Sequence, residues 1–142
     1  MIEVKNKKAY FDYTILEELE AGIALTGTEI KSIRKGSIDL KDTFVNIKNN
    51  EAFILNMYIA KYEEGNIFNH DERRTRKLLL HKKEIKKLKE QIKQEGLTII
   101  PLKLYFKKNK VKILIGVCKG KKLYDKRATL KEKDLKREAR YY

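Results

Sequence analysis

The sequence predicts a small, mainly β domain with flanking helices and a basic C-terminal tail. Apolar and polar residues alternate in several short segments, which is the period of a half-buried strand. One segment before the tail, residues 82–95, has helical spacing instead. The residues after 119 hold too few apolar side chains for a core. At 142 residues, 42% of them hydrophobic, the chain suits one compact domain over residues 1–119, followed by a tail over residues 120–142.

The first two expected strands lie before residue 37. Residues 10–16 alternate, so that one face would carry Phe11, Tyr13 and Ile15. In residues 20–36 the alternation resets near Gly27, after which Ile30 and Ile33 continue it. A glycine within a strand pattern indicates a bulge or a bend, which would let a small sheet curl.

The remaining elements follow in order. Residues 44–47 and 52–59 read as strands joined by a hairpin turn at residues 49–51. Residues 82–95 form a helix with one apolar stripe, and Gly96 stands where a C-terminal cap belongs. Residues 97–106 form a strand that Pro101 interrupts by a bulge or places at an edge. The last strand shows clean alternation of Val111, Ile113, Ile115 and Val117.

Short strands around one helix, with an early glycine bend, are typical of a closed β-barrel of the oligonucleotide-binding type. The same five or six strands could instead form an open sheet backed by the helix.

The charge of the chain indicates a polyanionic partner. Lys and Arg number 34 against 20 Asp and Glu, a formal net charge of +14. Such a field attracts nucleic acid and steers its association. No apolar run reaches the roughly 18 residues that span a bilayer, and the N-terminus lacks the apolar region of a signal peptide. We therefore expect a cytoplasmic protein with no membrane partner.

Catalysis has little support in the residues. Cys118 is the only cysteine, and neither His70 nor His81 has a second ligand at metal-binding spacing. The sequence has no nucleophile elbow, phosphate-binding glycine loop or catalytic triad signature. We expect no metal, no cofactor and no enzymatic activity.

Clustered cations and nearby aromatic residues are the candidate RNA-binding groups. The cations come from three segments: Lys31 and Arg34, Arg76 and Lys77, Lys110 and Lys112. They could contact phosphates along an RNA strand while aromatic rings stack on bases. Tyr10, Tyr105 and Phe106 are candidates for stacking, although core packing is the favoured interpretation of Phe106.

Three motifs together resemble the SsrA-binding protein family of bacterial trans-translation. They are EAGIALTGTEIKS from Glu20, RKLLLH from Arg76, and GKKLYDKR from Gly120. The resemblance extends over nearly the whole chain. It implies an oligonucleotide-binding-type barrel that binds the tRNA-like domain of transfer-messenger RNA and delivers it to ribosomes stalled on truncated messages.

The resemblance also implies how such a complex works. The barrel would mimic the anticodon half of a tRNA, and the tail would form a helix in the empty mRNA channel of the ribosome. Elongation factor Tu would be an indirect partner through the aminoacylated transfer-messenger RNA. We expect the protein itself to be a monomer.

Individual site residues follow from the same resemblance. Glu20 matches an acidic position that contacts the RNA elbow, and Leu79, His81 and Lys112 match the same RNA face. His81 stands where other members carry asparagine. Tyr124 takes the place of a residue that stacks in the decoding centre. The tail residues expected to contact the ribosome are Lys119, Gly120, Lys121, Lys122, Tyr124, Asp125, Lys126, Arg127, Lys131, Lys133, Lys136, Arg137 and Arg140.

Two other function classes stay open at the level of the residues alone. One is a general RNA-binding barrel, such as a ribosomal or initiation-factor-like protein, which would lack selectivity for one structured RNA. The other is an enzyme, which would require a convergent acid, base and nucleophile. For the tail, the alternative is a solvated extension without a binding role.

Overall fold

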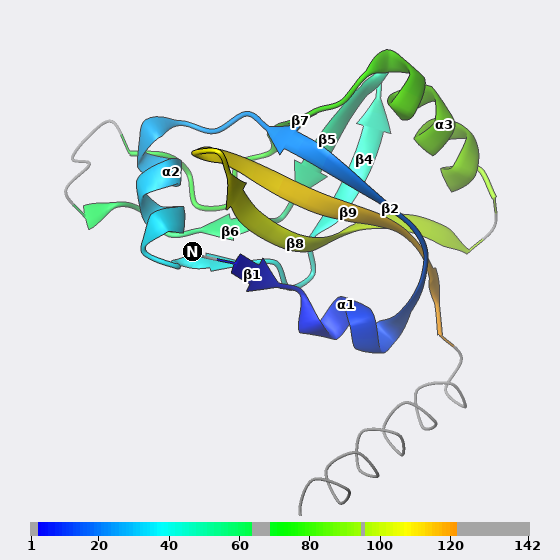
Figure 1. The fold of residues 1–142 in the computed structure, drawn as a ribbon, viewed down its shortest axis with the longest axis horizontal. Helices are drawn as coiled ribbons and strands as arrows, with labels where there is room; N and C mark the ends of the chain where they lie inside the picture. Colours follow the sequence, from blue (N-terminus) through cyan, green and yellow to red (C-terminus); the bar gives the residue numbers. More distant parts are fainter. Residues whose placement is uncertain (1–2, 64–68, 95, 122–142) are drawn as a thin grey trace, which may run out of the picture.

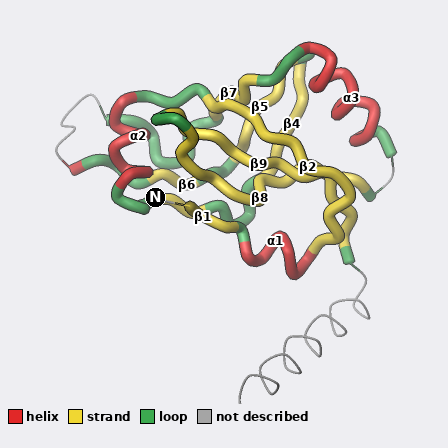
Figure 2. Tube along the Cα trace, viewed as in Figure 1, coloured by secondary structure: helices red, strands yellow, loops and turns green. Residues whose placement is uncertain are grey.

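The computed structural model describes residues 3–63, 69–94 and 96–121, and Figures 1 and 2 show helices at the periphery of a strongly bent sheet. Within these residues, no helix is both long and apolar enough to cross a membrane. The elements in chain order are β1 (Glu3–Lys5), α1 (Lys7–Asp12), β2 (Tyr13–Ile23), α2 (Gly27–Arg34), β3 (Ile38–Asp39), β4 (Phe44–Lys48), β5 (Glu51–Leu55), β6 (Tyr58–Ile59), β7 (Arg76–Leu79), α3 (Lys82–Ile92), β8 (Leu97–Lys107) and β9 (Lys110–Gly120).

The fold is mainly β, as predicted. The described strands of the main sheet follow the order β1-β8-β4-β5-β7-β2-β9, and β8 pairs again with β9. The pairings therefore lead from β8 through β4, β5, β7, β2 and β9 back to β8. The two short strands β3 and β6 pair separately.

The hairpin turn predicted at residues 49–51 and the bulge predicted at Pro101 are confirmed, although Glu51 already belongs to β5. Lys48 pairs with Glu51 across a two-residue turn in which Asn49 and Asn50 both have positive φ angles. Asparagine tolerates this left-handed conformation, and two such residues match the twist of a hairpin. In β8 the register with β9 shifts between Pro101 and Lys103, which is the bulge expected at the proline.

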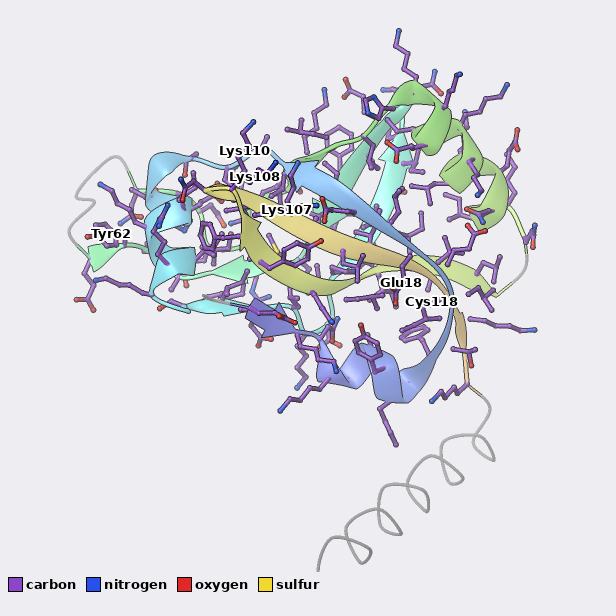
Figure 3. All side chains as sticks on the ribbon, viewed as in Figure 1. Glu18, Tyr62, Lys107, Lys108, Lys110 and Cys118 are labelled. Carbon is purple, nitrogen blue, oxygen red and sulfur yellow. The ribbon has the colours of Figure 1, made fainter. Side chains whose placement is uncertain are left out.

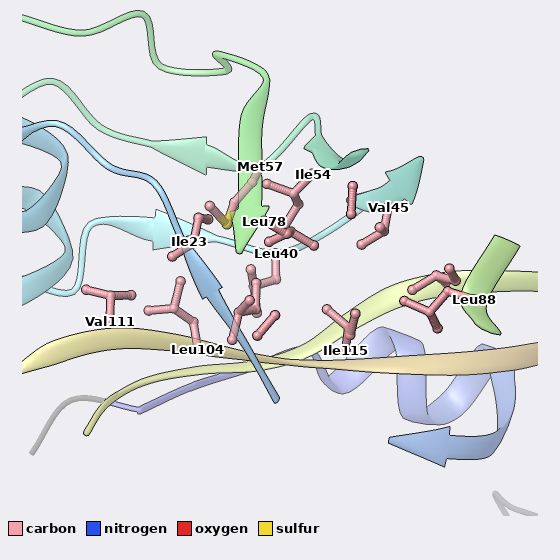
Figure 4. Close-up of a cluster of buried hydrophobic side chains, with 14 of the residues drawn as sticks. Ile23, Leu40, Val45, Ile54, Met57, Leu78, Leu88, Leu104, Val111 and Ile115 are labelled. Atoms are coloured by element: carbon pink, nitrogen blue, oxygen red, sulfur yellow. The ribbon is translucent and has the colours of Figure 1, made fainter. Parts of the chain in front are cut away.

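The core fills the space enclosed by the strands. Val111, Ile113, Ile115 and Val117 all point into it, which confirms the predicted inner face of β9. They meet residues from β4, β5, β7 and β8 (Figure 4), among them Val45, Ile54, Leu78 and Leu104. Helix α3 confirms the helix predicted from residue 82, although it ends at Ile92. It places Ile85 and Leu88 against the core, and Gly96 follows it with a φ of +79°.

The predicted strand over residues 10–16 is wrong in its first half, because residues 10–12 belong to helix α1. Asn6 caps this helix: its side-chain oxygen accepts a hydrogen bond from the backbone N–H of Ala9 at 3.2 Å. The Asn6 side chain also donates to the carbonyl oxygens of Leu40 and Pro101. These long-range bonds fix the cap, so the strand begins only at Tyr13, and Phe11 does not share its face.

The bent strand predicted over residues 20–36 is also wrong beyond Ile23. Thr26 and Glu29 form a capping box, with the Thr26 backbone N–H donating to the Glu29 carboxylate at 2.8 Å, and helix α2 follows. Ile30 and Ile33 lie on one face of this helix because they are three residues apart. The sequence signal for the helix, Thr-x-x-Glu, was present.

Candidate nucleic-acid interface

The outer face of β7, β2, β9 and β8 brings together side chains from four segments of the chain. Gly22 on β2 lies opposite Leu79 of β7 on one side and opposite Lys112 of β9 on the other. Lys112 lies opposite Tyr105 of β8. Glu20 is two residues before Gly22 and so shares its face. We call this surface, Glu20, Gly22, Leu79, Tyr105, Lys107, Lys110 and Lys112, the sheet face.

Glu20 is held by two donors from β8. The phenol of Tyr105 donates a hydrogen bond to one carboxylate oxygen, and the Lys107 ammonium lies 3.3 Å from the other. The hydrogen bond from Tyr105 holds the pKa of Glu20 below its ordinary value. Burial, reinforced by the bond to Glu20, raises the pKa of Tyr105 to about 12. At neutral pH the acid is therefore ionised and the phenol keeps its proton.

Leu79 presents apolar surface to solvent in the middle of this cationic face. Its side chain is 55% exposed, which is unusual for a leucine on a sheet. A Cβ atom on Gly22 would lie only 3.2 Å from the Leu79 Cβ, so the glycine lets the leucine lie close to the backbone of β2. Beside them is a shallow depression of about 340 Å³ that Lys110 and Lys112 also line. An exposed leucine in a basic depression suits a base or ribose above and phosphates at the rim.

The cations predicted on residues 31 and 34 lie on α2, next to aromatic rings. The Arg34 guanidinium is 4.9 Å from the ring centre of Phe106, at the β8–β9 hairpin. The Lys31 ammonium lies 5.4 Å from the ring of Tyr62, which Lys35 also approaches. Phe106 is partly buried against the core, which agrees with the favoured interpretation of this residue. Arg34 thus extends the positive charge of the hairpin toward α2.

Arg76 is not part of the surface, contrary to our expectation. Its side chain is fully buried and forms an ion pair with the equally buried Glu29. The guanidinium also donates to the carbonyl oxygens of Met57 and Arg74, at 2.7 and 3.0 Å. Because strand residues alternate, the next residue, Lys77, points outward and pairs with Glu51 at 3.2 Å. Of this predicted pair, only Lys77 can reach an RNA.

His81 lies at the start of α3, two residues after Leu79, and its side chain is exposed. Its backbone N–H donates to the Glu84 carboxylate at 2.9 Å, so the residue is the helix N-cap.

The beginning of the predicted tail is anchored to the sheet. Lys119 and Gly120 are the last residues of β9 and pair with Thr14 and Tyr13. The backbone N–H of Lys121 donates to Asp12 at 2.9 Å, and its ammonium reaches the Tyr10 carbonyl oxygen at 3.3 Å. The other predicted ribosome contacts, from Lys122 to Arg140, lie outside the described residues.

Sequence reasoning missed Gly22, and it assigned Tyr105 to base stacking rather than to holding Glu20. Asn109, between two strand patterns, is a turn signal in the sequence. In the structure, Lys108 and Asn109 form a two-residue turn with positive φ angles, and this turn sets Tyr105 opposite Lys112. The pairing of β2 with β9 is non-local, and its register could not be predicted from local sequence features.

The two faces of β9 predict a matched pair of substitutions. Lys112→Ala should weaken RNA binding and change the free energy of unfolding by less than about 0.5 kcal/mol, because a surface cation contributes little to folding. Ile113→Ala should cost about 2–5 kcal/mol of stability, since Ile113 is fully buried. Thermal unfolding and filter binding measure both effects. A larger loss of stability in Lys112→Ala would contradict the assigned faces.

Comparison with known proteins gives a consistent result. Residues 3–141 match the family model described as SmpB protein. The SsrA-binding protein of Ligilactobacillus salivarius is 57% identical over 136 residues, covering 96% of this chain and 88% of the relative. That of Staphylococcus epidermidis is 60% identical over 134 residues, covering 94% and 86%. A solved structure described as "tmRNA-SmpB: a journey to the center of the bacterial ribosome" matches with a TM-score of 0.73 and 48% identity, covering 85% of each chain.

Proposed function

Because the chain belongs to the SmpB protein family, we propose that it binds the tRNA-like domain of transfer-messenger RNA and delivers this RNA to stalled ribosomes. The relatives are named for binding SsrA RNA, and the structural neighbour assembles with transfer-messenger RNA in the ribosome. Delivery allows trans-translation, in which the stalled ribosome is rescued and the incomplete peptide is tagged.

The observation that carries this proposal is the convergence of Glu20, Leu79 and Lys112 on one surface. These residues come from three strands and lie around Gly22. Cations there attract phosphates without reading sequence, whereas the Glu20 carboxylate can accept further hydrogen bonds from base amino groups beside those from Tyr105 and Lys107. The sheet face therefore combines general attraction with a means of selection.

The strand pairings support a closed barrel of the oligonucleotide-binding type, because each strand of the ring from β8 back to β8 has a partner on both sides. The barrel, residues 1–119 with the end of β9, takes the place of the anticodon half of a tRNA. The residues after Lys121 enter the empty mRNA channel, with Tyr124, Asp125, Lys126 and Arg127 at the decoding centre. Elongation factor Tu joins through the aminoacylated RNA.

The test of RNA identity is recovery of the protein from a bacterial lysate, followed by sequencing of the bound RNA. Strong enrichment of transfer-messenger RNA is expected. Recovery of many structured RNAs in proportion to their abundance would favour a general RNA-binding barrel instead.

Glu20→Ala tests the proposed selectivity. We expect the affinity ratio between transfer-messenger RNA and an unrelated structured RNA to fall about tenfold, the size of one lost base contact. Binding of the unrelated RNA should stay equal or rise, because the variant gains net positive charge. Competition filter binding gives the ratio.

Glu17→Ala is the matched control for this prediction. Glu17 lies on the same strand, and its carboxylate pairs with Lys87 at 3.6 Å, away from the sheet face. Glu17→Ala changes the net charge by the same amount as Glu20→Ala, and it should leave the affinity ratio between the two RNAs unaltered. Equal loss of affinity for both RNAs in Glu20→Ala would make Glu20 a structural residue that positions β8.

A further inference from the structure

Helix α3 carries a stripe of lysines that the sheet face does not include. Lys82, Lys86, Lys89 and the C-cap residue Lys93 are spaced four, three and four residues apart, which places them within about 60° of the helix circumference. The stripe borders the buried face that holds Ile85 and Leu88. We call these four residues the lysine stripe.

The lysine stripe lines a groove between α3 and the β4–β5 turn. The groove has a volume of about 490 Å³, and Asn50 and Glu90 also line it. Lys89 reaches the side-chain oxygen of Asn50 at 3.5 Å. Four cations against one acid give the lining a charge of 4 − 1 = +3. Two pairs of like charges lie four residues apart, Lys82 with Lys86 and Lys89 with Lys93, and each pair disfavours the helix.

The stripe lysines lack acidic partners within the part of the chain that the structure describes. On the other side of α3, by contrast, Lys87 pairs with Glu17 of β2 at 3.6 Å. The stripe therefore keeps its positive charge available to an external anion. Its lysines are spread over twelve residues, about 16 Å of helix axis, which matches an extended polyanion better than a single small anion.

The lysine stripe and the sheet face share no residue, although α3 begins at Lys82, three residues after Leu79. Lys107, Lys108 and Lys110 gather at the β8–β9 hairpin, near α2, while α3 lies at the other end of the sheet (Figures 1 and 3). The groove borders the β4–β5 turn, whereas the sheet face runs over β7, β2, β9 and β8. None of the residues that line the groove belongs to the sheet face.

We infer that the lysine stripe is a second RNA-binding surface, which docks the phosphate backbone of ribosomal RNA while the sheet face holds transfer-messenger RNA. This inference rests on the proposed function. Lysines act as flexible point charges, which suits contact with backbone phosphates without sequence readout. Each neutralised phosphate releases condensed counterions, so the contact should be strongly dependent on salt.

The test compares two double variants on the same helix. Lys86→Gln with Lys89→Gln removes two charges from the stripe, and Lys83→Gln with Lys87→Gln removes two from the other side of α3. Both lower the net charge from +14 to +12, and glutamine has a helix propensity close to that of lysine. Binding of each full-length variant is measured to purified ribosomes over a salt series, and separately to transfer-messenger RNA.

The stripe variant should bind ribosomes more weakly, with a slope of log affinity against log salt that is flatter by about 1–2, and the control variant should behave like the parent. Lys86→Arg with Lys89→Arg should retain ribosome binding because the charge is kept. Equal effects of the two glutamine variants, or a loss confined to transfer-messenger RNA, would overturn the inference. A parent protein that binds ribosomes through the stripe but does not select transfer-messenger RNA would overturn the proposed function alone.

Discussion

Arg76→Met is expected to lower the free energy of unfolding by about 3 kcal/mol while leaving the RNA affinity of the folded protein near its parent value. Removing one partner of a buried ion pair leaves the other charge uncompensated, which costs about 3–5 kcal/mol. The lower end of that range applies because Arg74 still lies 2.6 Å from Glu29. The carbonyl oxygens of Met57 and Arg74 lose a donor as well. Denaturant unfolding and filter binding provide the two measurements.

Lys77→Met is the control for this substitution. It makes the same change one residue later, on the outward side of β7, where Lys77 is exposed. The free energy of unfolding of the Lys77→Met variant should remain close to that of the parent, and its RNA affinity should fall modestly. If Arg76→Met instead kept its stability and lost RNA affinity, Arg76 would belong to the RNA-binding surface after all.

The ion pair also explains how α2 is fixed to the sheet. Glu29 is the third residue of α2 and accepts hydrogen bonds from Arg74, from the backbone of Thr26 and from Arg76. Burial alone would raise the pKa of Glu29, but these bonds lower it below its ordinary value. The same carboxylate thus caps the helix and holds β7. Loss of the pair should therefore disturb two elements that are remote in sequence.

The parts of the fold that the sequence predicted correctly depend on neighbours along the chain. The alternation of Ile113 and Ile115, the asparagine turn at residues 49 and 50, and the apolar stripe of α3 all follow from local spacing. Helix α1 was missed because its cap, Asn6, is fixed by bonds to Leu40 and Pro101, which are 34 and 95 residues away. Local propensity carries no information about such bonds.

The candidate site was predicted less completely for the same reason. Charge alone suggested that Arg76 faces solvent, but Arg76 shares the inner face of β7 with Leu78, and its partner Glu29 is 47 residues away. The alternation along β7 could have separated Arg76 from Lys77. The bond between Glu20 and Tyr105 joins residues 85 apart and depends on two strand registers. The family resemblance identified Glu20 as an RNA contact, but it did not reveal that Tyr105 and Lys107 position its carboxylate.

Truncation after Lys121 is expected to abolish peptide tagging on stalled ribosomes while transfer-messenger RNA binding changes only a few-fold. This end point keeps the pairing of Gly120 with Tyr13 and the bond from Lys121 to Asp12, so the barrel should unfold like the full chain. The removed residues carry eight cations and four acids, a charge of 8 − 4 = +4, and leave 14 − 4 = +10 on the barrel. Attraction by the lost charges is screened beyond about 8 Å at physiological ionic strength.

The measurement pairs RNA affinity with tagging in a reconstituted translation system. A full-length chain with residues 122–142 in scrambled order keeps the length and charge of the tail, and it separates sequence from electrostatics. If tagging depends on defined contacts by Tyr124, Asp125 and Lys126, the scrambled chain should fail like the truncated one, because matching charge cannot restore stacking and directed hydrogen bonds. Full activity of the scrambled chain would reduce the tail to a polycation, and full activity of the truncated chain would remove it from the mechanism.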